Sequence, residues 1–356
     1  RTRQALDAGE KIMVHGDYDV DGITSAALLV RVLRLLKADV SWFLPSRQRE
    51  GYDIGRGAVD VAKERGVGLI ITADCGTSAV EAIEHANSLG IDVIVTDHHE
   101  VGSEVANAHS VVNPRRPDCP YPFKDLAGVG VAYRFAEALV RECGYDVASY
   151  RRRFCDLAAI GTVADVVPLL GENRAIVSAG LEEIPRTGKK GLRALMETSG
   201  LMMKQITSQV LAFVLAPRIN AAGRLADASI ALDLMLTNDE QQAYQLAQLL
   251  ESHNRERQSA QERIHQEALG QIDSRGIGED SRVFVLASGG WHSGIVGIVA
   301  SKITDRFNRP TILVALDDTG KSGVGSARSI AEFDLFDALT RCKHLLERCG
   351  GHARAA

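Results

Sequence analysis

Short β-rich runs alternate with helical stretches between Lys11 and Pro114, and this alternation limits the possible folds more than any other feature of the sequence. The β-rich runs are KIMVHG, VSWFLP, GLIITADCG, IDVIVTDHH and SVVNP. The helical stretches are ITSAALLVRVLRLLK, GAVDVAKERG and SAVEAIEHANSLG, and Ser78 with Glu81 predicts a capping box at the start of the last one. Strands that alternate with helices form βαβ units. The pattern therefore predicts an α/β fold with a mainly parallel sheet flanked by helices.

The remainder of the chain predicts a helical middle and a second, smaller α/β domain. The stretches DLAGVGVAYRFAEALVRECG and YRRRFCDLAAIGTVADVV have the apolar periodicity of helices. The polar segment 239–273 predicts a long exposed helix, with disorder as the alternative. A new α/β pattern begins at Arg282 with RVFVLAS, SGIVGIVASKITDRF and PTILVAL. We expect a catalytic domain over 1–236, a connecting helix over 237–274 and a substrate-binding domain over 275–356.

Composition narrows the possible partners and compartments. No apolar run reaches the roughly 18 residues of a membrane span, so no membrane partner is expected. The six cysteines form no CxxC pair, which favours a reducing cytoplasm. The formal net charge of −5 argues weakly against a nucleic-acid partner, but carboxylates clustered around cations would account for it and leave room for a local basic groove. A monomer is expected.

The first chemical motif is HGDYDVDG, which ends the first predicted strand and contains His15, Asp17, Asp19 and Asp21. Carboxylates a few ångströms apart repel one another unless a cation or protons neutralise them. The alternative is a solvated turn with an Asp helix cap, which would account for one of these acids at most. The motif therefore predicts a cation site.

Three further segments place acids or histidines where they can join this motif. Asp74 directly follows the apolar run GLIIT, although a helix cap or turn is its ordinary role. The triplet Asp97-His98-His99 follows another apolar run, so one imidazole can bind metal while Asp97 orients a ring through a hydrogen bond. Asp165 lies in an apolar stretch, where burial requires a cap, an arginine or a metal as partner. Because the carboxyl ends of parallel strands share one edge, these residues are expected to converge.

The resulting set of ligands contains oxygen and imidazole nitrogen but no cysteine. Such a set suits Mn²⁺ or Mg²⁺ better than structural zinc. Two cations roughly 3.5–4 Å apart generate hydroxide near neutral pH and stabilise an in-line phosphoryl transition state. The implied reaction is hydrolysis of a phosphate ester or anhydride.

These motifs resemble the DHH phosphoesterase family, whose first motif HxxxDxDG reads here as His15, Asp19, Asp21 and Gly22. The resemblance implies two divalent cations, Mn²⁺ or Mg²⁺, with Asp74 and Asp165 as bridging ligands. The implied ligands are His15, Asp19, Asp21, Asp74, His98 and Asp165. His99 would face the scissile phosphate. Asp17 is an extra acid that is either a metal ligand or a residue that supports the ligands. His99 and Asp17 are thus the catalytic candidates, supported by Asp97.

Within that family, HGDYDVDG, LPSRQREGY, PRINAAGR and GGHARAA are similar to the RecJ branch of single-strand DNA exonucleases, from about Lys11 to the end. Asp53 departs from the pattern, which usually has Gly after Tyr. The usual GGHxxAAG ends here before its last Gly, and with Arg1 in place of Met this predicts a fragment of a longer protein. The resemblance implies 5′→3′ degradation of single-stranded DNA to mononucleotides in DNA repair and recombination. A single-strand-binding protein and a helicase are the implied partner proteins.

The RecJ-like segments also supply candidates for binding the DNA. Ser326 and Arg328 in GKSGVGSARSI can present a hydroxyl and a guanidinium to the 5′ phosphate together with Arg47, although a surface salt bridge is the alternative for Arg328. Four other candidates have weaker support, and for those in PRINAAGR a structural hinge is the alternative. These are Arg218, Asn220, Arg224 and His352.

Two other functions share the metal motifs. A nanoRNase, cyclic-dinucleotide phosphodiesterase or pyrophosphatase would use the same ligands, but the RecJ-like segments PSR and GSARS argue against it. An inactive scaffold similar to the replication-fork relatives would have lost ligands. Every implied ligand is present, which argues against a scaffold.

Overall fold

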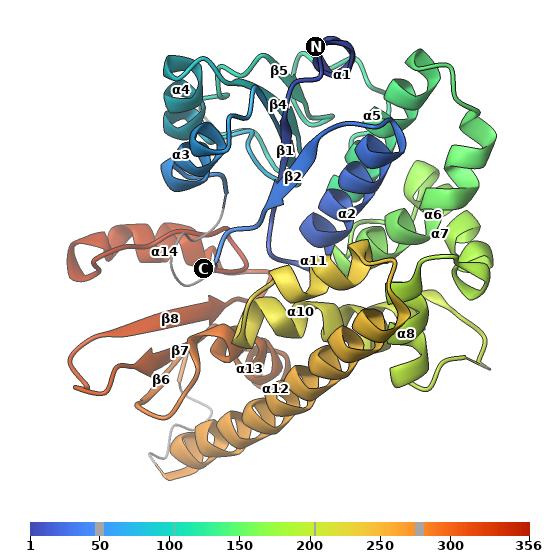
Figure 1. Ribbon diagram of the computed structural model, residues 1–356. Coiled ribbons are helices and arrows are strands. Elements are labelled where there is room, and N and C mark those ends of the chain that lie inside the picture. Colours follow the sequence, from blue (N-terminus) through green and yellow to red (C-terminus); the bar gives the residue numbers. More distant parts are fainter. Residues whose placement is uncertain (47–52, 103, 203, 275–280) are drawn as a thin grey trace. The chain divides into compact units, whose positions relative to one another are not determined.

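The computed structural model describes residues 1–46, 53–102, 104–202, 204–274 and 281–356 (Figure 1). The chain folds into two compact units, Arg1–Asn254 and Arg255–Ala356. The boundary between them falls inside α12 (Glu240–Ser274), a single helix of 35 residues. This helix occupies most of the segment in which a connecting helix was expected, while the predicted domain limits 1–236, 237–274 and 275–356 stay predictions.

The first unit is built on a five-stranded parallel sheet with the order β2-β1-β3-β4-β5. Its strands are β1 (Ile12–Gly16), β2 (Val40–Phe43), β3 (Leu69–Ala73), β4 (Asp92–Thr96) and β5 (Ser110–Val112). Every residue of β1 and β3 is buried, as expected of parallel strands covered on both faces. The prediction of a mainly parallel sheet flanked by helices is confirmed.

Helices cover both faces of this sheet because successive side chains of a strand point to opposite faces. Ile12 and Val14 of β1 face one hydrophobic core, whereas Met13 between them faces a second. The first core contains residues of α2 (Val20–Leu35) and α5 (Gly128–Glu142). The second contains residues of α3 (Arg56–Glu64) and α4 (Val80–Ser88). Figure 1 shows the two pairs of helices on opposite sides of the sheet.

The remaining helices of the first unit belong to the layer beside α2, where α6 packs against α2 and α5. Their bounds are α1 (Thr2–Ala8), α6 (Val147–Ala164), α7 (Gly171–Glu183), η1 (Ile184–Arg186), α8 (Lys190–Thr198), α9 (Ser208–Val210), η2 (Leu211–Leu215), α10 (Ala216–Leu225) and α11 (Ser229–Leu236). Segment η2 is a π-helical turn, and it leads directly into α10. The PRINAAGR segment therefore lies on a continuous helical stretch.

The capping box predicted for α4 is wrong. The helix starts after Ala79, and no side chain caps it. Ser78 instead offers its carbonyl oxygen to the N–H of Val80 at 2.9 Å. The preceding residue explains the difference, because the N–H of Thr77 donates to Asp97 Oδ2 at 3.0 Å. A contact with the neighbouring strand end thus fixes the loop before the helix begins.

The second unit contains a three-stranded mixed sheet with the order β6-β7-β8. Its elements are β6 (Phe284–Ser288), α13 (Ser293–Phe307), β7 (Thr311–Leu316), β8 (Gly323–Arg328), α14 (Leu335–Arg341) and η3 (Lys343–Leu345). β6 and β7 are parallel, and β8 is antiparallel to β7. The Gly-rich segment GKSGVGSARSI, for which no strand was predicted, therefore supplies an edge of this sheet.

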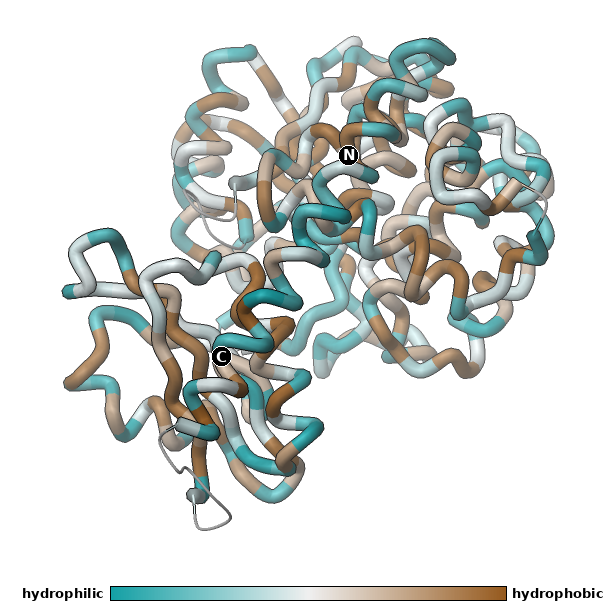
Figure 2. The backbone as a smooth tube through the Cα atoms, turned by 90° about the horizontal axis from the view of Figure 1, so that it is seen from below, coloured by the Kyte–Doolittle hydropathy of each residue, from teal (hydrophilic) through white to brown (hydrophobic). Residues whose placement is uncertain are grey.

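Hydropathy alternates over short stretches along the backbone (Figure 2). Among the described residues, no helix combines the length and the apolar content that crossing a bilayer requires.

Candidate metal centre

The acidic motifs meet at the carboxyl edge of the parallel sheet. The backbone N–H groups of Asp17, Asp74 and Asp97 donate to carbonyl oxygens of the neighbouring strands at 3.3, 2.9 and 3.1 Å, so each acid directly continues the sheet ladder. The chain leaves β1 through α2 on one face and leaves β3 through α4 on the other. Such a reversal between adjacent strands opens a crevice where α/β proteins bind ligands. The order of the strands thus places the acids at the crevice where a ligand is expected to bind.

Within the described ranges, three groups of acids and histidines have ligand atoms that all lie within 4.8 Å of one another. These groups are Asp74 with His98 and His99, Asp21 with His98 and Asp165, and Asp17 with Asp19 and Asp74. Asp74 and His98 each belong to two groups, so the three groups form one cluster. His15 belongs to none of the three. The structure therefore brings together seven of the eight residues predicted as ligands or catalytic groups.

The imidazole of His98 lies at the centre of this cluster. Its Nε2 is 3.2 Å from Asp74 Oδ1, 3.6 Å from Asp165 Oδ2 and 3.9 Å from Asp21 Oδ2. Burial and then the charge of His99 lower the pKa of His98 to about 4, so the ring is neutral near neutral pH. Its Nε2 forms no hydrogen bond of favourable geometry within the described part of the chain. A neutral imidazole that faces three carboxylates is suited to bind a cation.

The carboxylates of the cluster cannot all stay ionised without a cation. Burial, followed by the charges of neighbouring aspartates, raises the pKa of Asp17, Asp21 and Asp74 well above the usual range. Burial and then Asp19 raise the pKa of Asp165 to about 7. The metal-free site therefore retains protons near neutral pH, and divalent cations can replace them.

Two acids of the first motif also cap helices. Asp19 Oδ1 accepts the N–H of Gly22 at 3.0 Å at the start of α2. The two oxygens of Asp21 accept the N–H groups of Gly128 and Val129 at 2.7 and 2.8 Å at the start of α5. The local helix cap thus accounts for one of these acids, Asp19, while Asp21 binds the start of a helix that is distant in sequence. The caps orient both carboxylates, and each carboxylate retains lone pairs for a cation.

The backbone is strained beside two of the acids. Asp74 has a φ of 67° and Val166, directly after Asp165, has a φ of 63°. This left-handed region is costly for residues other than glycine, and for a β-branched residue above all. A Cβ at Gly128 would lie 2.3 Å from Asp74 Oδ1, so only glycine fits beside this carboxylate. Strain and close packing together fix the position of Asp74.

His99 is held by Asp97 at the exposed side of the cluster. Asp97 Oδ1 is 2.8 Å from His99 Nδ1, and it also accepts the backbone N–H groups of His98 and His99. Burial alone would lower the pKa of His99, but the hydrogen bond and charge of Asp97 outweigh it and raise the pKa to about 9. The side chain of His99 is 40% exposed, against 3% for Asp74. An imidazolium is therefore the partly exposed member of a group whose neighbouring carboxylate is buried.

His15 is fully buried beneath the cluster. Its ring stacks on Phe43 with centroids 5.6 Å apart, and its Nδ1 is 3.6 Å from the Cys75 sulfur. Burial lowers its pKa to about 4. Its Nε2 has no hydrogen-bond partner among the described residues. A buried neutral nitrogen without a partner fits a metal ligand, although no set of ligand atoms within 4.8 Å in the described chain includes it.

Asp53 is a further acid near the site that the sequence did not single out for a role. Its φ is 78°, and burial, with a smaller contribution from Asp97, raises its pKa to about 6. Its charge also raises the pKa of Asp17. The only signal in the sequence was that Asp replaces the usual Gly at this position.

The PRINAAGR segment contacts the backbone of the first acidic motif and of the helix that follows it. Asn220 Oδ1 accepts the N–H of Val20 at 3.2 Å, at the first residue of α2. A Cβ at Gly223 would lie 2.7 Å from the carbonyl oxygen of Tyr18, so α10 packs closely against the acidic loop. These contacts hold the acids from a segment about 200 residues away in sequence.

The other residues of the first unit that were predicted to contact DNA differ in their surroundings. Arg218 donates to Glu251 Oε2 at 2.6 Å and to the carbonyl oxygen of Val214 at 2.7 Å. Arg224 is partly buried in the last turn of α10. Arg47 lies outside the described residues.

In the second unit, the predicted contacts lie on β8 and on the C-terminal segment. Arg328 donates to Ser326 Oγ at 3.1 Å, and a Cβ at Gly297 of α13 would lie 2.7 Å from that hydroxyl. The C-terminal segment pairs with β8, since Ala355 forms isolated bridges with both Arg328 and His352. The three predicted residues of this unit are therefore neighbours at one edge of its sheet.

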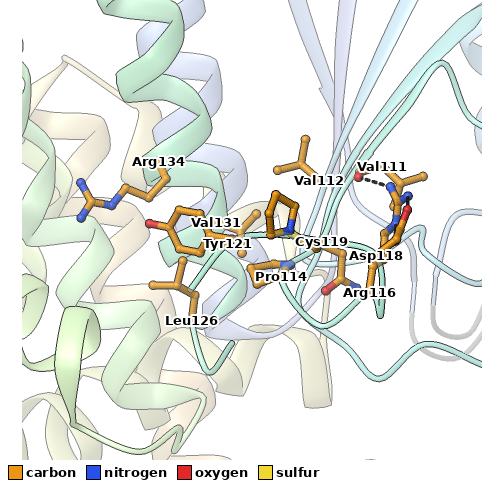
Figure 3. Close-up of a pocket in the computed structure, with 12 residues that line it drawn as sticks. Val111, Val112, Pro114, Arg116, Asp118, Cys119, Tyr121, Leu126, Val131 and Arg134 are labelled. Atoms are coloured by element: carbon orange, nitrogen blue, oxygen red, sulfur yellow. Dashed lines mark hydrogen bonds and ion pairs between the residues drawn. The ribbon is translucent and has the colours of Figure 1, made fainter. Parts of the chain in front are cut away.

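A cavity of about 400 Å³ beside β5 is distinct from the metal cluster (Figure 3). Its lining is mainly apolar and includes Tyr121, Leu126 and Val131 but none of the clustered acids. Asn113 connects the two regions, because its Nδ2 donates to Thr77 Oγ1 and to the carbonyl oxygen of His99. The cavity therefore borders the metal cluster without supplying its chemistry.

Comparisons with known proteins found similar sequences and similar structures. The DHH family, N-terminal domain, matches residues 11–162, and the DHHA1 domain matches residues 280–356. Over its full length the chain is 44% identical to the single-stranded-DNA-specific exonuclease RecJ of Bacillus subtilis, of which it covers 44%. A crystal structure of exonuclease RecJ bound to manganese superposes with a TM-score of 0.87 at 39% identity, over 99% of this chain and 86% of the other. RecJ of Thermus thermophilus in complex with Mn²⁺ gives a TM-score of 0.86 at 38% identity, over 99% of this chain and 50% of the other. The chain spans between 44% and 64% of the length of the first two curated relatives.

Proposed function

Because the chain belongs to the RecJ branch of the DHH family, we propose that it degrades single-stranded DNA from the 5′ end to mononucleotides with the help of two divalent cations. The observation that carries the proposal is the cluster of aspartates around His98, whose ligand atoms lie within 4.8 Å of one another. Scattered surface acids would not retain protons near neutral pH, as Asp165 does with a pKa of about 7.

The proposed cations are Mn²⁺ or Mg²⁺, and the chain offers them a set of buried oxygen and nitrogen donors. The proposed ligands are His15, Asp19, Asp21, Asp74, His98 and Asp165, with Asp17 beside them. His15 Nε2, His98 Nε2 and Asp165 Oδ2 are buried without hydrogen-bond partners in the described residues, which is costly unless a ligand satisfies them. When bound, the cations supply a hydroxide near neutral pH and stabilise negative charge on the phosphate. Manganese in the related RecJ crystal structures supports this assignment.

His99 and Asp97 complete the proposed active site. The hydrogen bond to Asp97 keeps the imidazole of His99 protonated, with a pKa of about 9, and in a fixed orientation. A protonated and partly exposed imidazole can donate to a phosphate oxygen and stabilise the charge that develops there. We propose that His99 contacts the scissile phosphate and that Asp97 acts by positioning it.

The proposed DNA contacts differ in how well the structure supports them. Ser326, Arg328 and His352 are neighbours at the edge of one sheet, where a hydroxyl and a guanidinium can bind a 5′ phosphate. Arg218 is paired with Glu251, and Asn220 holds the start of α2, so these two support the fold of the first unit in addition to any role at the DNA. Arg47 and Arg224 complete the proposed set.

We also propose a substrate and a biological setting for this chain. The names of the relatives specify single-stranded DNA as the substrate, and we propose the same substrate for this chain. We further propose that it acts in DNA repair and recombination in the cytoplasm as a monomer, together with a single-strand-binding protein and a helicase.

The substitution Asp74→Asn tests the proposal because it keeps the shape of the side chain and removes its charge. We expect manganese binding to weaken strongly and cleavage to fall roughly 100-fold or more, since Asp74 belongs to two of the three ligand groups. Calorimetric titration with Mn²⁺ and cleavage of a single-stranded oligonucleotide measure the two effects. Asp7→Asn, which removes an exposed carboxylate from α1, is the matched control. Undiminished cleavage by Asp74→Asn would reject the site.

The direction of cleavage is tested with two labels on one oligonucleotide. A 5′ label is expected to appear at once as a mononucleotide, while a 3′ label stays on long fragments until late in the reaction. The opposite order, or attack on dinucleotides alone, would favour a nanoRNase-like function.

A further inference from the structure

A second cavity of about 570 Å³ lies in the first unit, at the end of α2 that is distant from the metal cluster. Asp21 is in the first turn of α2 and Arg34 is in its last turn, 13 residues further on. At a rise of about 1.5 Å per residue, the two positions are roughly 20 Å apart. The cavity is lined by residues of α2 and α6, of the segment from α7 to the start of α8, and of the end of α11. We call it the α2–α6 cavity.

The lining of the α2–α6 cavity is strongly basic, although the chain as a whole has a net charge of −5. The basic side chains are Arg31, Arg34, Arg152, Arg153, Arg186 and Lys189. Of the described residues, only two carboxylates, those of Asp156 and Glu183, line the same cavity. Six basic and two acidic side chains leave an excess of four positive charges.

One of the two carboxylates is already committed to the floor of the cavity. Lys189 Nζ lies 2.8 Å from both oxygens of Asp156, and Thr187 Oγ1 donates to the same carboxylate at 2.7 Å. Lys189, Asp156 and Thr187 are all buried. The Asp156 carboxylate is therefore bound by Lys189 and Thr187, and among the described residues it forms no ion pair with the arginines that line the cavity.

The arginines repel one another. Burial lowers the pKa of Arg31, and the charges of Arg153 and Arg34 lower it further, with Asp156 opposing them. Arg31 is fixed by donating to the carbonyl oxygen of Met235 at 2.7 Å. Holding several cations around one concave surface is unfavourable unless an anion binds among them.

Among the described residues, none of the arginines at the rim, which are Arg34, Arg153 and Arg186, forms an ion pair. Burial raises the pKa of the Asp233 carboxyl on α11, and the charge of Arg34 opposes this rise. The dipole of α2 can stabilise Arg34 in its last turn, but it does not account for the two others. Arg153 extends from the exposed side of α6 beside Phe154, and Arg186 ends η1. Guanidinium groups from three separate elements thus surround one space.

We propose that the α2–α6 cavity binds a ligand with two adjacent phosphate groups, of the size of a nucleoside diphosphate. Its volume lies within the range of roughly 300–1,000 Å³ that is typical of small-molecule sites. A nucleoside diphosphate carries about −3 charges near neutral pH, about −1 on its inner phosphate and about −1.5 to −2 on its terminal phosphate, so the four excess positive charges can neutralise it. The fork of donors on each guanidinium fits the oxygens of a phosphate. A nucleic-acid strand could also offer two successive phosphates to these arginines, although each of them is a diester with a single negative charge.

Calorimetric titration of the full chain with inorganic pyrophosphate and with adenosine diphosphate tests the proposal. Metal ions are removed beforehand and the chelator is dialysed away, so that phosphate cannot bind through a cation at the metal cluster. We expect saturable binding of one pyrophosphate per chain. The double variant Arg34→Gln with Arg153→Gln is expected to bind it roughly tenfold more weakly or worse, because each guanidinium contributes charge-assisted hydrogen bonds.

The matched control is the double variant Arg174→Gln with Arg193→Gln. It makes the same change in net charge with two exposed arginines, on α7 and α8, that do not line the cavity. We expect its affinity for pyrophosphate to equal that of the unaltered chain, and circular dichroism must show that both double variants are folded. Absence of binding at millimolar pyrophosphate, or equal weakening in both double variants, would overturn the proposal.

Two further titrations identify the source of the phosphate and separate the cavity from the metal cluster. The first titration uses a short oligothymidylate. If it displaces pyrophosphate and binds more weakly to the Arg34→Gln and Arg153→Gln double variant, the cavity binds a nucleic-acid strand. If it does not, the ligand is a free nucleotide. Asp74→Asn is expected to retain full pyrophosphate binding even where it abolishes cleavage. Loss of pyrophosphate binding in Asp74→Asn would place the phosphate at the metal cluster and contradict the proposal.

Discussion

At the scale of single residues, the histidines His98 and His99 have opposite electrostatic environments although they are adjacent in sequence. Burial lowers the pKa of His98 to about 4, whereas the hydrogen bond and charge of Asp97 raise that of His99 to about 9 against the effect of burial. A neutral ring suits a metal ligand, and a charged ring suits contact with phosphate. Asp97 creates the difference because its oxygen lies 2.8 Å from His99 Nδ1.

The substitution Asp97→Asn should therefore lower the pKa of His99 in the metal-free protein by about one unit or more, toward the ordinary value near 6.5. An amide keeps the size of the side chain but removes the negative charge that stabilises the imidazolium. Titration of the histidine resonances by NMR measures the shift. Asp60→Asn, which alters the exposed pair with His85, is the control and should leave His99 unchanged. A pKa of His99 that stays near 9 in Asp97→Asn would show that Asp97 is not the cause.

At the scale of elements, the starts of two helices hold the metal cluster in place. Asp19 caps α2, and Asp21 caps α5, which begins 107 residues further along the chain. Gly128, the first residue of α5, lies so close to Asp74 that a Cβ there would be 2.3 Å from the carboxylate. The same helix start thus positions acids from two strand ends.

The substitution Gly128→Ala should destabilise the protein by about 1–3 kcal/mol and weaken manganese binding, because overpacking must displace Asp74. Alanine favours a helix by about 0.5–1 kcal/mol over glycine, but this gain is smaller than the clash. Urea denaturation and Mn²⁺ titration measure the two effects. Gly57→Ala in α3, where a Cβ would meet nothing within 4 Å, is the control and should be neutral or slightly stabilising. Equal stability of Gly128→Ala and Gly57→Ala would contradict this account.

At the scale of the whole molecule, the metal cluster makes the stability of the metal-free protein depend on pH. Asp165 has a folded pKa of about 7 against an unfolded value of 3.8, and His99 has about 9 against 6.5. In both cases the folded state binds more protons in the interval, so stability falls as pH rises through it. His15 and His98 have pKa values of about 4 and act in the opposite direction, but this effect fades above about pH 7, where the unfolded histidines have lost most of their protons.

We therefore expect the melting temperature of the metal-free protein to fall by several degrees between pH 6.5 and 8.5. Each group contributes up to about 1.4 kcal/mol per pH unit within its own interval. Addition of Mn²⁺ should restore the melting temperature at pH 8.5, because a ligand that binds only the folded state stabilises it. Asp165→Asn should reduce the slope, and differential scanning calorimetry with and without Mn²⁺ checks both expectations. A melting temperature that rises over this pH interval would contradict the assignment.

The parallel α/β architecture and the location of the acids at strand ends could be predicted without a structure. Apolar runs such as GLIIT must be buried on both faces, and parallel strands bring their carboxyl ends to one edge. Family resemblance added the identity of the branch, which the relatives confirm. These features follow from local patterns and from the order of elements, so they are readable without coordinates.

The partner of each side chain, in contrast, could not be predicted and became known from the folded chain. Asp21 caps a helix 107 residues away, Asn220 holds the start of α2 and Thr77 binds Asp97 in place of the predicted capping box. The approach of Asp53 to the acids and the basic α2–α6 cavity likewise depend on contacts between distant segments. Spacing in the sequence encodes the period of a helix or strand, whereas such contacts depend on how whole elements pack.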